Sequence, residues 1–447
     1  MTKIMDDSII VYTFGCRMNA FETQCIYKIM QDIKMKNVTL VNTCTVTAES
    51  ERQVRQMIRK LHREYPDNHL ILTGCASQLH SDFFIKMPEV DFVVGNEFKL
   101  QRWVYEKINS WFNDCKDDSQ KNDQKKTLQK QFLTQNKLCI PENNKTIYDN
   151  DWEYIYNFED RSRAFVPIQT GCDHYCSYCV VPFTRGRFKS YNQKHIIEQV
   201  KIFVNNGYNE VVLTGIDITD YGKDIRNKHS IDTLGKLCKE ILKETKLQRL
   251  RLSSVDVAEV DDDVMDLIKN EERFMPYFHI SLQSGSDSVL KRMRRRHTYS
   301  DVINFCKTVR LSRLESAFGA DIIAGFPSET DEEFSQSIKI VKEAPITFVH
   351  AFPYSKRERT LASLMSDDVP KDVKKNRVKE LIKLGEENLQ EIYKKMDGTN
   401  QKVLIERDCV ARAENFVKIE IINPDKYTFG SIIEAKVYFK NKKLYLK

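Results

Sequence analysis

The chain lacks long hydrophobic runs. None of the apolar stretches in its 447 residues approaches the roughly 20 residues that a membrane-spanning helix requires. Its first residues, Met1–Asp7, carry acidic side chains and no apolar core of the kind found in secretion signals. We therefore expect a cytoplasmic protein that is not bound to a membrane.

A strong excess of charge is also missing. The 70 basic and 64 acidic residues leave a net charge of +6, which is a weak argument for binding nucleic acid. Two local basic runs, Lys291–His297 and Lys356–Arg359, usually indicate solvated faces, and they favour RNA contact only because they fall among the catalytic motifs described below. No Ser/His/Asp arrangement and no pair of acid–base carboxylates stands out in the sequence.

What the chain does have is cysteine, and twelve of them in a reducing compartment indicate metal or redox chemistry more than disulfides. Cys172, Cys176 and Cys179 have C-x3-C-x2-C spacing directly after a strand-like run, Ala164–Ile168. Thiolates that converge in so short a loop select zinc, copper(I) or an iron–sulfur cluster. A zinc site needs a fourth ligand, and His174 is a crowded candidate because it lies inside the loop. The spacing favours a four-iron, four-sulfur cluster with one iron open to a small molecule, over zinc or three buried structural cysteines.

The first hundred residues repeat a unit in which an apolar run, a polar or glycine turn and a cysteine follow one another. The cysteines are 28 and 31 residues apart, which matches the length of a strand–helix unit. Such units form a parallel sheet whose strands end at one edge, so we expect the three thiols to meet there and hold a second cluster. A single cysteine in such a place is more often a small buried hydrophobe, but three in register favour the cluster. The runs and their cysteines are Ser8–Gly15 with Cys16, Val38–Thr43 with Cys44, and His69–Gly74 with Cys75.

The rest of the chain divides by composition. Residues 113–157 are mostly polar and are predicted to form a linker. In residues 158–395, six strand-like runs alternate with amphipathic stretches, which predicts a partial barrel with its chemistry on the loops after the strands. Residues 396–447 alternate with period two and predict a small antiparallel barrel. The cysteines outside both trios are expected to be ordinary thiols: Cys25, Cys115, Cys139, Cys238, Cys306 and Cys409.

The cysteine loop resembles that of the radical S-adenosylmethionine (SAM) enzymes, and the wider run Cys172–Gly186 resembles the methylthiotransferases among them. Three N-terminal runs are similar to the other motifs of that family: Thr13–Asn19, Asn42–Thr47 and Thr73–Cys75. The resemblance implies an α/β protein with four parts. They are an N-terminal parallel α/β sheet domain at 1–112, the linker at 113–157, a partial (βα)6 radical SAM barrel at 158–395 and a small TRAM-like β-barrel at 396–447.

The resemblance also implies the cofactors and partners. It implies SAM and two [4Fe-4S] clusters, one that binds SAM and releases a radical from it, and an auxiliary one that handles the sulfur to be inserted. The first would be held by Cys172, Cys176 and Cys179, and the auxiliary one by Cys16, Cys44 and Cys75. The residues implied to contact SAM are Gly215, Asp217 and Gln283. The implied partners are the anticodon loop of tRNA, a reducing electron donor such as a flavodoxin, and a sulfur source.

Two substrate branches of the family compete. Asn42–Thr47 with the arginines that follow it, Val289–Arg295 and Asp217–Thr219 resemble the branch that acts on N6-threonylcarbamoyladenosine beside the tRNA anticodon. The carboxylate of that nucleoside suits a basic pocket better than an isoprenoid tail would. The alternative substrate is N6-isopentenyladenosine in tRNA. An alternative of another class is a non-catalytic, metal-containing RNA-binding protein.

Overall fold

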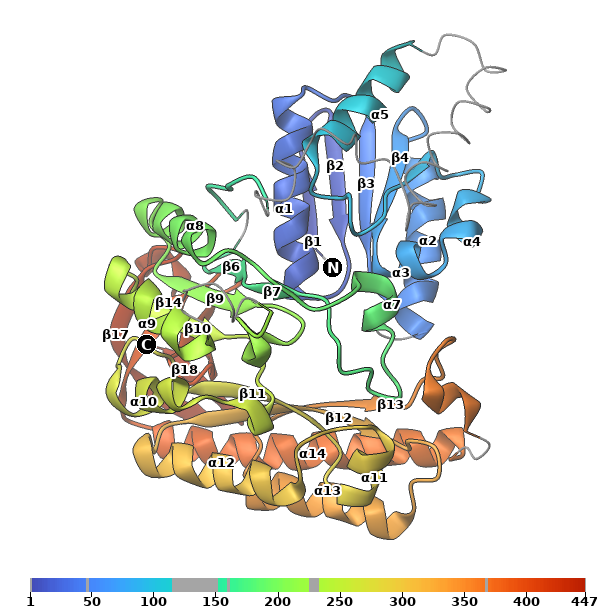
Figure 1. Cartoon of the computed structure of the whole chain (residues 1–447). Helices are drawn as coiled ribbons and strands as arrows, with labels where there is room; N and C mark the ends of the chain where they lie inside the picture. The colour runs from blue at the N-terminus through green and yellow to red at the C-terminus, as the bar shows by residue number, and fades with distance from the viewer. Residues whose placement is uncertain are drawn as a thin grey trace. The chain divides into compact units, whose positions relative to one another are not determined.

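The structure is a computed structural model that describes residues 2–45, 48–114, 152–158, 161–224, 233–365 and 369–446. It divides into two compact units. The first comprises Met1–Glu159 and Val181–Arg187, and the second comprises Asp160–Val180 and Phe188–Lys447. Figure 1 labels the helices and strands of both units. The short segment Val181–Arg187 belongs to the first unit although it follows Cys179 closely in sequence.

The first unit contains a five-stranded sheet in the order β1-β2-β3-β4-β5. β2, β3, β4 and β5 pair in parallel, which confirms the predicted parallel sheet, whereas β1 pairs antiparallel with β2. β1 and β5 were not predicted, because they are too short to show a clear alternation of apolar residues. The strands are β1 Thr2–Met5, β2 Ile9–Thr13, β3 Val38–Thr43, β4 His69–Gly74 and β5 Phe92–Val93.

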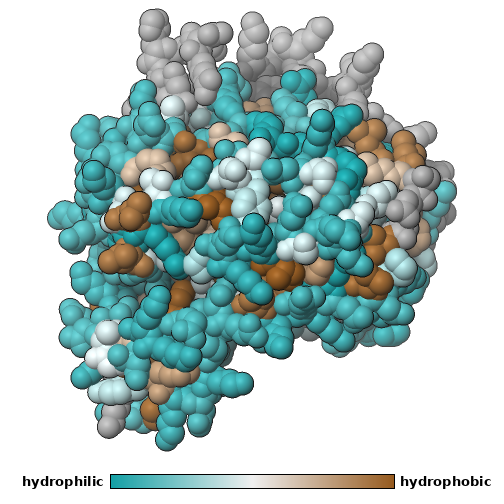
Figure 2. Space-filling view, turned by 90° about the horizontal axis from the view of Figure 1, so that it is seen from below, coloured by the Kyte–Doolittle hydropathy of each residue, from teal (hydrophilic) through white to brown (hydrophobic). Residues whose placement is uncertain are grey.

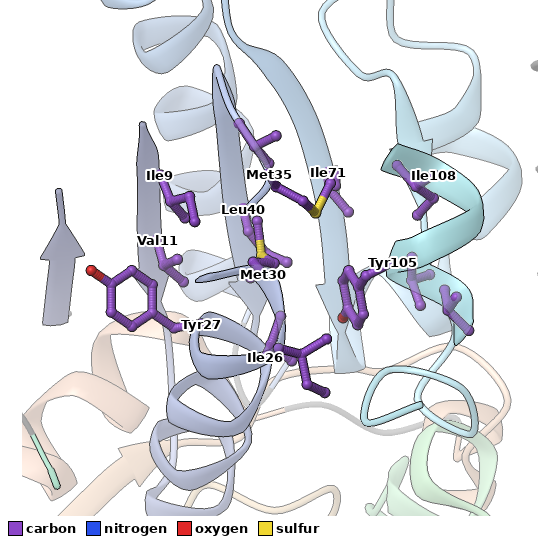
Figure 3. Close-up of a cluster of buried hydrophobic side chains, with 14 of the residues drawn as sticks. Ile9, Val11, Ile26, Tyr27, Met30, Met35, Leu40, Ile71, Tyr105 and Ile108 are labelled. Carbon is purple, nitrogen blue, oxygen red and sulfur yellow. The ribbon is translucent and has the colours of Figure 1, made fainter. Parts of the chain in front are cut away.

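Helices cover both faces of this sheet. Side chains of α1 and α5 pack on one face, and the buried core that they form is shown in Figure 3. Side chains of α2 pack on the other face. Each large aliphatic side chain buried in these two cores contributes about 1.5–3 kcal/mol to the free energy of unfolding. The helices of the unit are α1 Arg17–Asp32, α2 Ala48–Glu64, α3 Cys75–Leu79, α4 Ser81–Ile85, α5 Arg102–Asp114 and α7 Val181–Arg185.

Part of the expected linker belongs to the first unit and is packed in it. Trp152, Ile155 and Phe158 are buried, and the Trp152 ring meets the Phe21 ring edge-on with the centroids 5.2 Å apart. These apolar residues lie at the end of a polar segment. The average composition of that segment therefore gave no indication that they are buried. Residues 115–151 lie outside the described residues, and the boundaries 1–112, 113–157, 158–395 and 396–447 stay predictions.

The second unit contains two three-stranded parallel sheets, in the orders β10-β9-β6 and β11-β12-β13. Two isolated parallel bridges, Leu250 with Phe274 and Val255 with Ile280, continue the pairing from β10 towards β11. The six strands therefore form the open partial barrel that the sequence predicted. They are β6 Ala164–Pro167, β9 Glu210–Thr214, β10 Arg249–Leu252, β11 Tyr277–Gln283, β12 Ala317–Ala324 and β13 Phe348–Pro353.

Helices follow the strands and begin at polar caps. The Asn192 side chain accepts hydrogen bonds from the first turn of α8, and Thr298 and Thr330 form capping boxes at α12 and α13. The helices are α8 Gln193–Asn205, α9 Leu234–Glu244, α10 Asp262–Asn270, α11 Asp287–Arg292, α12 Tyr299–Ser312, α13 Asp331–Glu343 and α14 Lys371–Met396. Two short strands, β7 Gln169–Thr170 and β8 Lys189–Ser190, pair antiparallel in a separate two-stranded sheet.

The C-terminal segment closes into a five-stranded barrel in the order β14-β15-β16-β18-β17. Within residues 400–446 the pairs are antiparallel except β16 with β18, which are parallel, so the all-antiparallel prediction is wrong at that pair. The barrel closes there between strands that are not consecutive, which alternation alone does not reveal. β15 was missed because it has only four residues and two of them are alanines. The strands are β14 Asn400–Ile405, β15 Val410–Ala413, β16 Lys418–Ile421, β17 Ile432–Lys440 and β18 Lys443–Leu446.

Phe416 connects this barrel to the strands of the larger barrel. The guanidinium groups of Arg163, Arg251 and Arg412 lie 5.2, 5.0 and 4.7 Å from the centre of its ring. The ring also stacks on Tyr277 of β11 at 4.9 Å. Cation–π contacts of this kind contribute about 0.5–2 kcal/mol each, so this one ring is a main anchor between the two barrels.

The surface carries apolar residues in separate patches rather than in one continuous area on the face that Figure 2 shows. Isolated apolar residues of this kind are normal on protein surfaces and indicate no binding site by themselves. Among the described residues, no helix combines the length and the apolar character that crossing a membrane requires.

Candidate functional site

The first trio of cysteines gathers at one edge of the N-terminal sheet. Cys16 immediately precedes α1, Cys44 directly follows β3, and Cys75 is the first residue of α3 after β4. In the sheet register Thr13 pairs with Asn42, and Thr43 pairs with Gly74. The three cysteines therefore follow the carboxyl ends of three neighbouring parallel strands.

Two glycines let the backbone before Cys16 and Cys75 pass close to the end of β3. Gly15 has a φ of +94°, and a Cβ atom built there would lie 2.6 Å from Cys44 Sγ. Gly74 has a φ of +98°, and a Cβ there would collide with the backbone of Thr43. Only glycine adopts these conformations without strain, so the turns before Cys16 and Cys75 pass directly against the β3 end that carries Cys44.

A buried charge cluster lies beside this trio. Lys99 Nζ donates hydrogen bonds of 2.6 Å to Glu22 and 2.8 Å to Asn96 Oδ1, and Arg185 donates to both oxygens of Glu22, at 2.8 and 3.1 Å. Asn96 Nδ2 lies 3.9 Å from Cys75 Sγ. Burial lowers the pKa of Lys99, while Glu22 opposes that shift. Two cations share one carboxylate here, so these three side chains leave one positive charge in excess, which favours an anionic group at the thiols.

Sequence reasoning missed this cluster. Glu22, Lys99 and Arg185 are far apart along the chain, and no local pattern connects them. Two signals were present in the sequence: Arg185 lies at the end of the motif Cys172–Gly186, and Glu22 with Thr23 follows the motif Thr13–Asn19. The structure shows that α7, which ends in Arg185, belongs to the first unit and contacts α3, the helix that begins with Cys75.

The second trio lies in the loop after β7 of the second unit. The Cys179 N–H donates to the Cys176 carbonyl at 3.0 Å, and the His174 N–H points at Cys172 Sγ at 3.5 Å. Burial raises the pKa of the Cys172 thiol to about 12. Thiols must lose their protons to bind metal, so loading this loop with a metal centre releases protons.

The basic run Lys291–His297 holds this loop in place. Arg295 donates hydrogen bonds to Asp256 and to the Ser281 carbonyl, both at 2.9 Å, and to Cys176 Sγ at 3.7 Å. His297 is buried and donates to the Leu282 carbonyl at 3.0 Å. The expectation of a solvated face or an RNA-facing surface is therefore wrong for these two residues, because internal partners neutralise or satisfy them.

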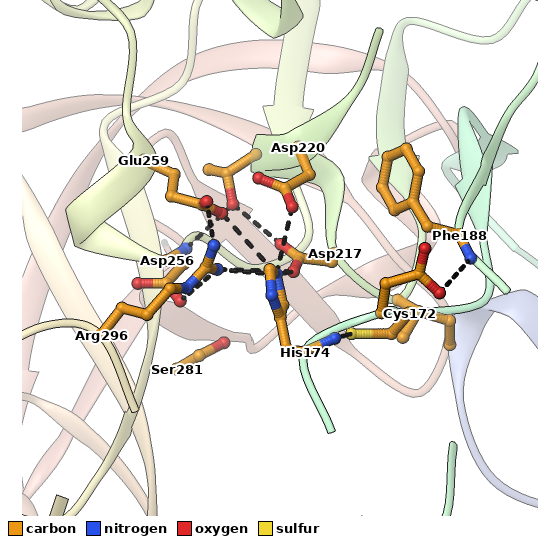
Figure 4. A network of polar contacts seen from close by, with 12 residues as sticks. Cys172, His174, Phe188, Asp217, Asp220, Asp256, Glu259, Ser281 and Arg296 are labelled. Atoms are coloured by element: carbon orange, nitrogen blue, oxygen red, sulfur yellow. Dashed lines mark hydrogen bonds and ion pairs between the residues drawn. The ribbon is translucent and has the colours of Figure 1, made fainter. Parts of the chain in front are cut away.

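His174 and Asp217 meet at the centre of a charged network, which Figure 4 shows. His174 Nε2 contacts Asp217, and it lies 3.1 Å from Asp220 and 3.9 Å from Glu259. Hydrogen bonds with the two aspartates raise the pKa of His174 to about 10. Burial and the neighbouring Asp220 raise the pKa of Glu259 to about 7. Arg296 pairs with Glu259, lies 3.5 Å from Asp256 and also lies 2.6 Å from His174 Nε2, so the four carboxylates of the network share two neighbouring cationic groups.

The residues predicted to contact SAM lie at the carboxyl ends of two strands. Asp217 is beside the cysteine loop, since ligand atoms of Cys172, His174 and Asp217 all lie within 4.8 Å of one another. Gly215 follows β9 and is packed against Gln169, whose Oε1 accepts the Asp217 N–H at 2.9 Å. Gln283 ends β11 with a φ of +65°. Contact of these residues with SAM stays a prediction.

Four cysteines outside the trios fall within the described residues. Cys25, Cys238 and Cys306 are buried, and Cys409 is exposed. Burial raises the pKa of Cys306 to about 12, and it raises those of Cys25 and Cys238 as well. Cys115 and Cys139 lie outside the described residues.

An open parallel barrel whose first strand leads into a C-x3-C-x2-C loop defines a radical SAM protein. Residues 166–341 match the Radical SAM superfamily, and residues 8–95 match the uncharacterized protein family UPF0004. The radical SAM methyltransferase TsrM from Kitasatospora setae has the same fold, with a TM-score of 0.52 and 12% identity over 76% of this chain and 66% of that chain.

Relatives define the family more narrowly. The threonylcarbamoyladenosine tRNA methylthiotransferase MtaB of Rickettsia prowazekii (strain Madrid E) is 40% identical over 96% of this chain and 94% of that protein. The protein of the same name from Aquifex aeolicus (strain VF5) is 33% identical over 91% and 95%. The chain belongs to this family of threonylcarbamoyladenosine tRNA methylthiotransferases.

Proposed function

We propose that this protein attaches a methylthio group to N6-threonylcarbamoyladenosine beside the anticodon of tRNA. The observation that carries the proposal is the pair of cysteine trios, one placed after the carboxyl ends of three parallel strands of the first unit and the other in the loop after β7 of the second unit. Family membership supports the choice of substrate, because the two relatives above are both named for threonylcarbamoyladenosine.

The donor set of the second unit fits a [4Fe-4S] cluster better than zinc. Cys172, Cys176 and Cys179 supply three thiolates, which would leave one iron open for SAM. The alternative zinc site would need His174 to join all three sulfurs. Among the described residues, the group of ligand atoms within 4.8 Å of one another pairs His174 with Cys172 and Asp217, without Cys176 or Cys179.

When bound, the cluster and SAM supply the one-electron chemistry that an unactivated adenine C–H bond requires. The protein's own residues hold and tune that centre. Arg295 donates a hydrogen bond to Cys176 Sγ, and hydrogen bonds to ligating sulfur shift a cluster's reduction potential. Asp256 and the Ser281 carbonyl fix the Arg295 guanidinium in this position.

We also propose that the three cysteines of the N-terminal sheet hold a second [4Fe-4S] cluster. Cys16, Cys44 and Cys75 would hold it through three thiolates, and the cluster would supply the sulfur to be inserted. The positive charge left over from Lys99 and Arg185 after pairing with Glu22 would stabilise an anionic centre beside Cys75.

The C-terminal barrel suits contact with RNA. Its strand β17 carries an exposed Tyr438 with Lys436 5.9 Å from the ring, and further lysines lie at the β17–β18 turn. Exposed aromatic rings beside cations are what single-stranded RNA stacks on. We also propose a reducing protein such as a flavodoxin and a separate sulfur source as partners, in the cytoplasm.

Mass spectrometry of tRNA nucleosides tests the proposal. Cells without the gene are expected to lose the methylthio derivative of threonylcarbamoyladenosine and to accumulate the unmodified nucleoside. Gene copies with Cys172→Ala or Cys44→Ala should fail to restore it, and a copy with Cys409→Ser, an exposed thiol outside both trios, should restore it fully. Loss of the methylthio mark from isopentenyladenosine instead would overturn the choice of substrate.

A further inference from the structure

Three side chains of metal-binding type meet on neighbouring strands of the second unit, outside both cysteine trios. His279 Nε2 lies 3.1 Å from Asp321 Oδ1, and His350 Nδ1 lies 3.4 Å from the same oxygen. One ligand atom of each residue lies within 4.8 Å of the other two. None of these three residues has a role in the function proposed above.

The strand register places the three residues on one face. Asp321 of β12 pairs directly with His350 of β13, and His279 of β11 pairs with Gly319, two residues before Asp321. Side chains two residues apart on a strand point to the same side, so His279, Asp321 and His350 share a face of the sheet.

That face is the interior of the barrel. The alternate residues point the other way, towards helices: the Phe278 ring meets Phe305 of α12 at 6.0 Å, and Val349 lies against Gly385 of α14. Ile323, which shares the face of Asp321, packs against the same buried cluster as Tyr178 of the cysteine loop. The triad therefore lies on the inward face of the strands.

The surroundings of His279 are those of a ligating imidazole. Its Nδ1 atom lies 3.2 Å from the Tyr277 hydroxyl, which leaves Nε2 directed at Asp321. Gly319 makes room for this arrangement, because a Cβ atom there would lie 2.7 Å from His279 Nδ1. Metal-binding histidines commonly form such a hydrogen bond through the nitrogen that does not ligate.

The separations agree with coordination geometry. Bonds of 2.0–2.1 Å in a tetrahedral site place neighbouring ligand atoms about 3.3 Å apart. The two separations in the structure, 3.1 and 3.4 Å, lie on either side of that value. The side chains of His350 and Asp321 are 55% and 39% exposed, so an ion between them has positions left for water or another oxygen ligand.

We propose that His279, Asp321 and His350 bind a divalent zinc ion in the interior of the barrel. Two imidazoles and one carboxylate with open positions are a ligand set that such ions accept. A carboxylate bridging two imidazole rings with no ion is the competing description of the same contacts.

Zinc binding to the full chain distinguishes the two. The cysteine sites are first loaded with iron and sulfide without oxygen, and the protein is then equilibrated with zinc and desalted. We expect about one zinc per chain with nitrogen and oxygen ligands in the zinc X-ray absorption spectrum. Asp321→Asn and His350→Ala should weaken zinc binding by at least about tenfold, and His62→Ala, on the exposed end of α2, should leave it unchanged.

Iron content and thermal unfolding of each variant show whether it has kept its fold. If Asp321→Asn does not fold, His350→Ala decides alone, since that ring is half-exposed and contributes little to packing. Zinc bound only through sulfur, no retained zinc, or equal zinc in the wild type and the folded variants would each overturn the proposal. The measurement uses no tRNA and no SAM, so its failure leaves the proposed function standing.

Discussion

Glu22→Gln is expected to destabilise the first unit strongly. Glu22 is 3% exposed and is the shared carboxylate of Lys99, which is 1% exposed, and of the buried Arg185. Glutamine keeps the size of the side chain and removes its charge. Both cations then stay buried without a counter-charge.

The expected cost follows from burial. Removing one partner of a buried ion pair lowers the free energy of unfolding by about 3–5 kcal/mol, because the remaining charge is desolvated and unpaired. Asp32→Asn on the same helix is the matched control. Asp32 pairs with Lys28 at 2.6 Å and Arg102 at 2.9 Å, but its side chain is 39% exposed, so the loss there should be at most about 1 kcal/mol.

Tryptophan fluorescence during urea unfolding of the metal-free chain measures this cost. The three tryptophans of the sequence, Trp103, Trp111 and Trp152, all fall in the first unit, so their signal follows that unit alone. We expect a large loss of unfolding free energy for Glu22→Gln and a small loss for Asp32→Asn. Equal and small losses in both variants would refute the reasoning that this charge cluster is buried and mutually dependent.

Three further predictions concern the second unit. Phe416→Ala should lower the free energy of unfolding by about 2–3 kcal/mol, which is less than the cost of removing a fully buried ring. The variant should also make the C-terminal barrel more sensitive to limited proteolysis. Cleavage at the wild-type rate would contradict the role of Phe416 as an anchor. Burial raises the pKa of Glu210, but Arg251 and Arg163 outweigh it and hold the pKa at about 2. The stability that Glu210 provides is therefore complete above about pH 4.5 and lost as the pH falls towards 2, and acid unfolding of Glu210→Gln should lack that dependence. Arg295→Gln should lower the reduction potential of the centre on Cys176 at unchanged iron content, because a positive hydrogen-bond donor to sulfur is lost; an unaltered potential in an electron paramagnetic resonance titration would count against this.

The sequence was sufficient for features that depend on local spacing. Apolar runs at strand–helix intervals predicted the three strands that end near Cys16, Cys44 and Cys75, and the six strands of the larger barrel. The position of the cysteine loop after Ala164–Ile168 was also predictable. Residues that follow a parallel strand lie at the carboxyl-end edge of the sheet, where ligands bind.

Features that depend on contacts between residues far apart in the sequence could not be predicted from the sequence. The charge cluster at Glu22 joins residues up to 163 positions apart, and the triad at His279 depends on the register of three strands. Arg295 was expected on a solvated face because the sequence of the run Lys291–His297 shows only its positive charge. The fold pairs Arg295 with the Asp256 carboxylate, which is distant in the sequence. Parallel pairing of β16 with β18 likewise follows from closure of the barrel.

The most direct test of the central claim is the iron content of the anaerobically reconstituted protein and of two triple variants. We expect about eight irons per chain in the wild type, and about four when either trio is replaced by alanine. The first variant replaces Cys16, Cys44 and Cys75, and the second replaces Cys172, Cys176 and Cys179. Full iron retention in either triple variant, or zinc in place of iron in the wild type, would contradict it.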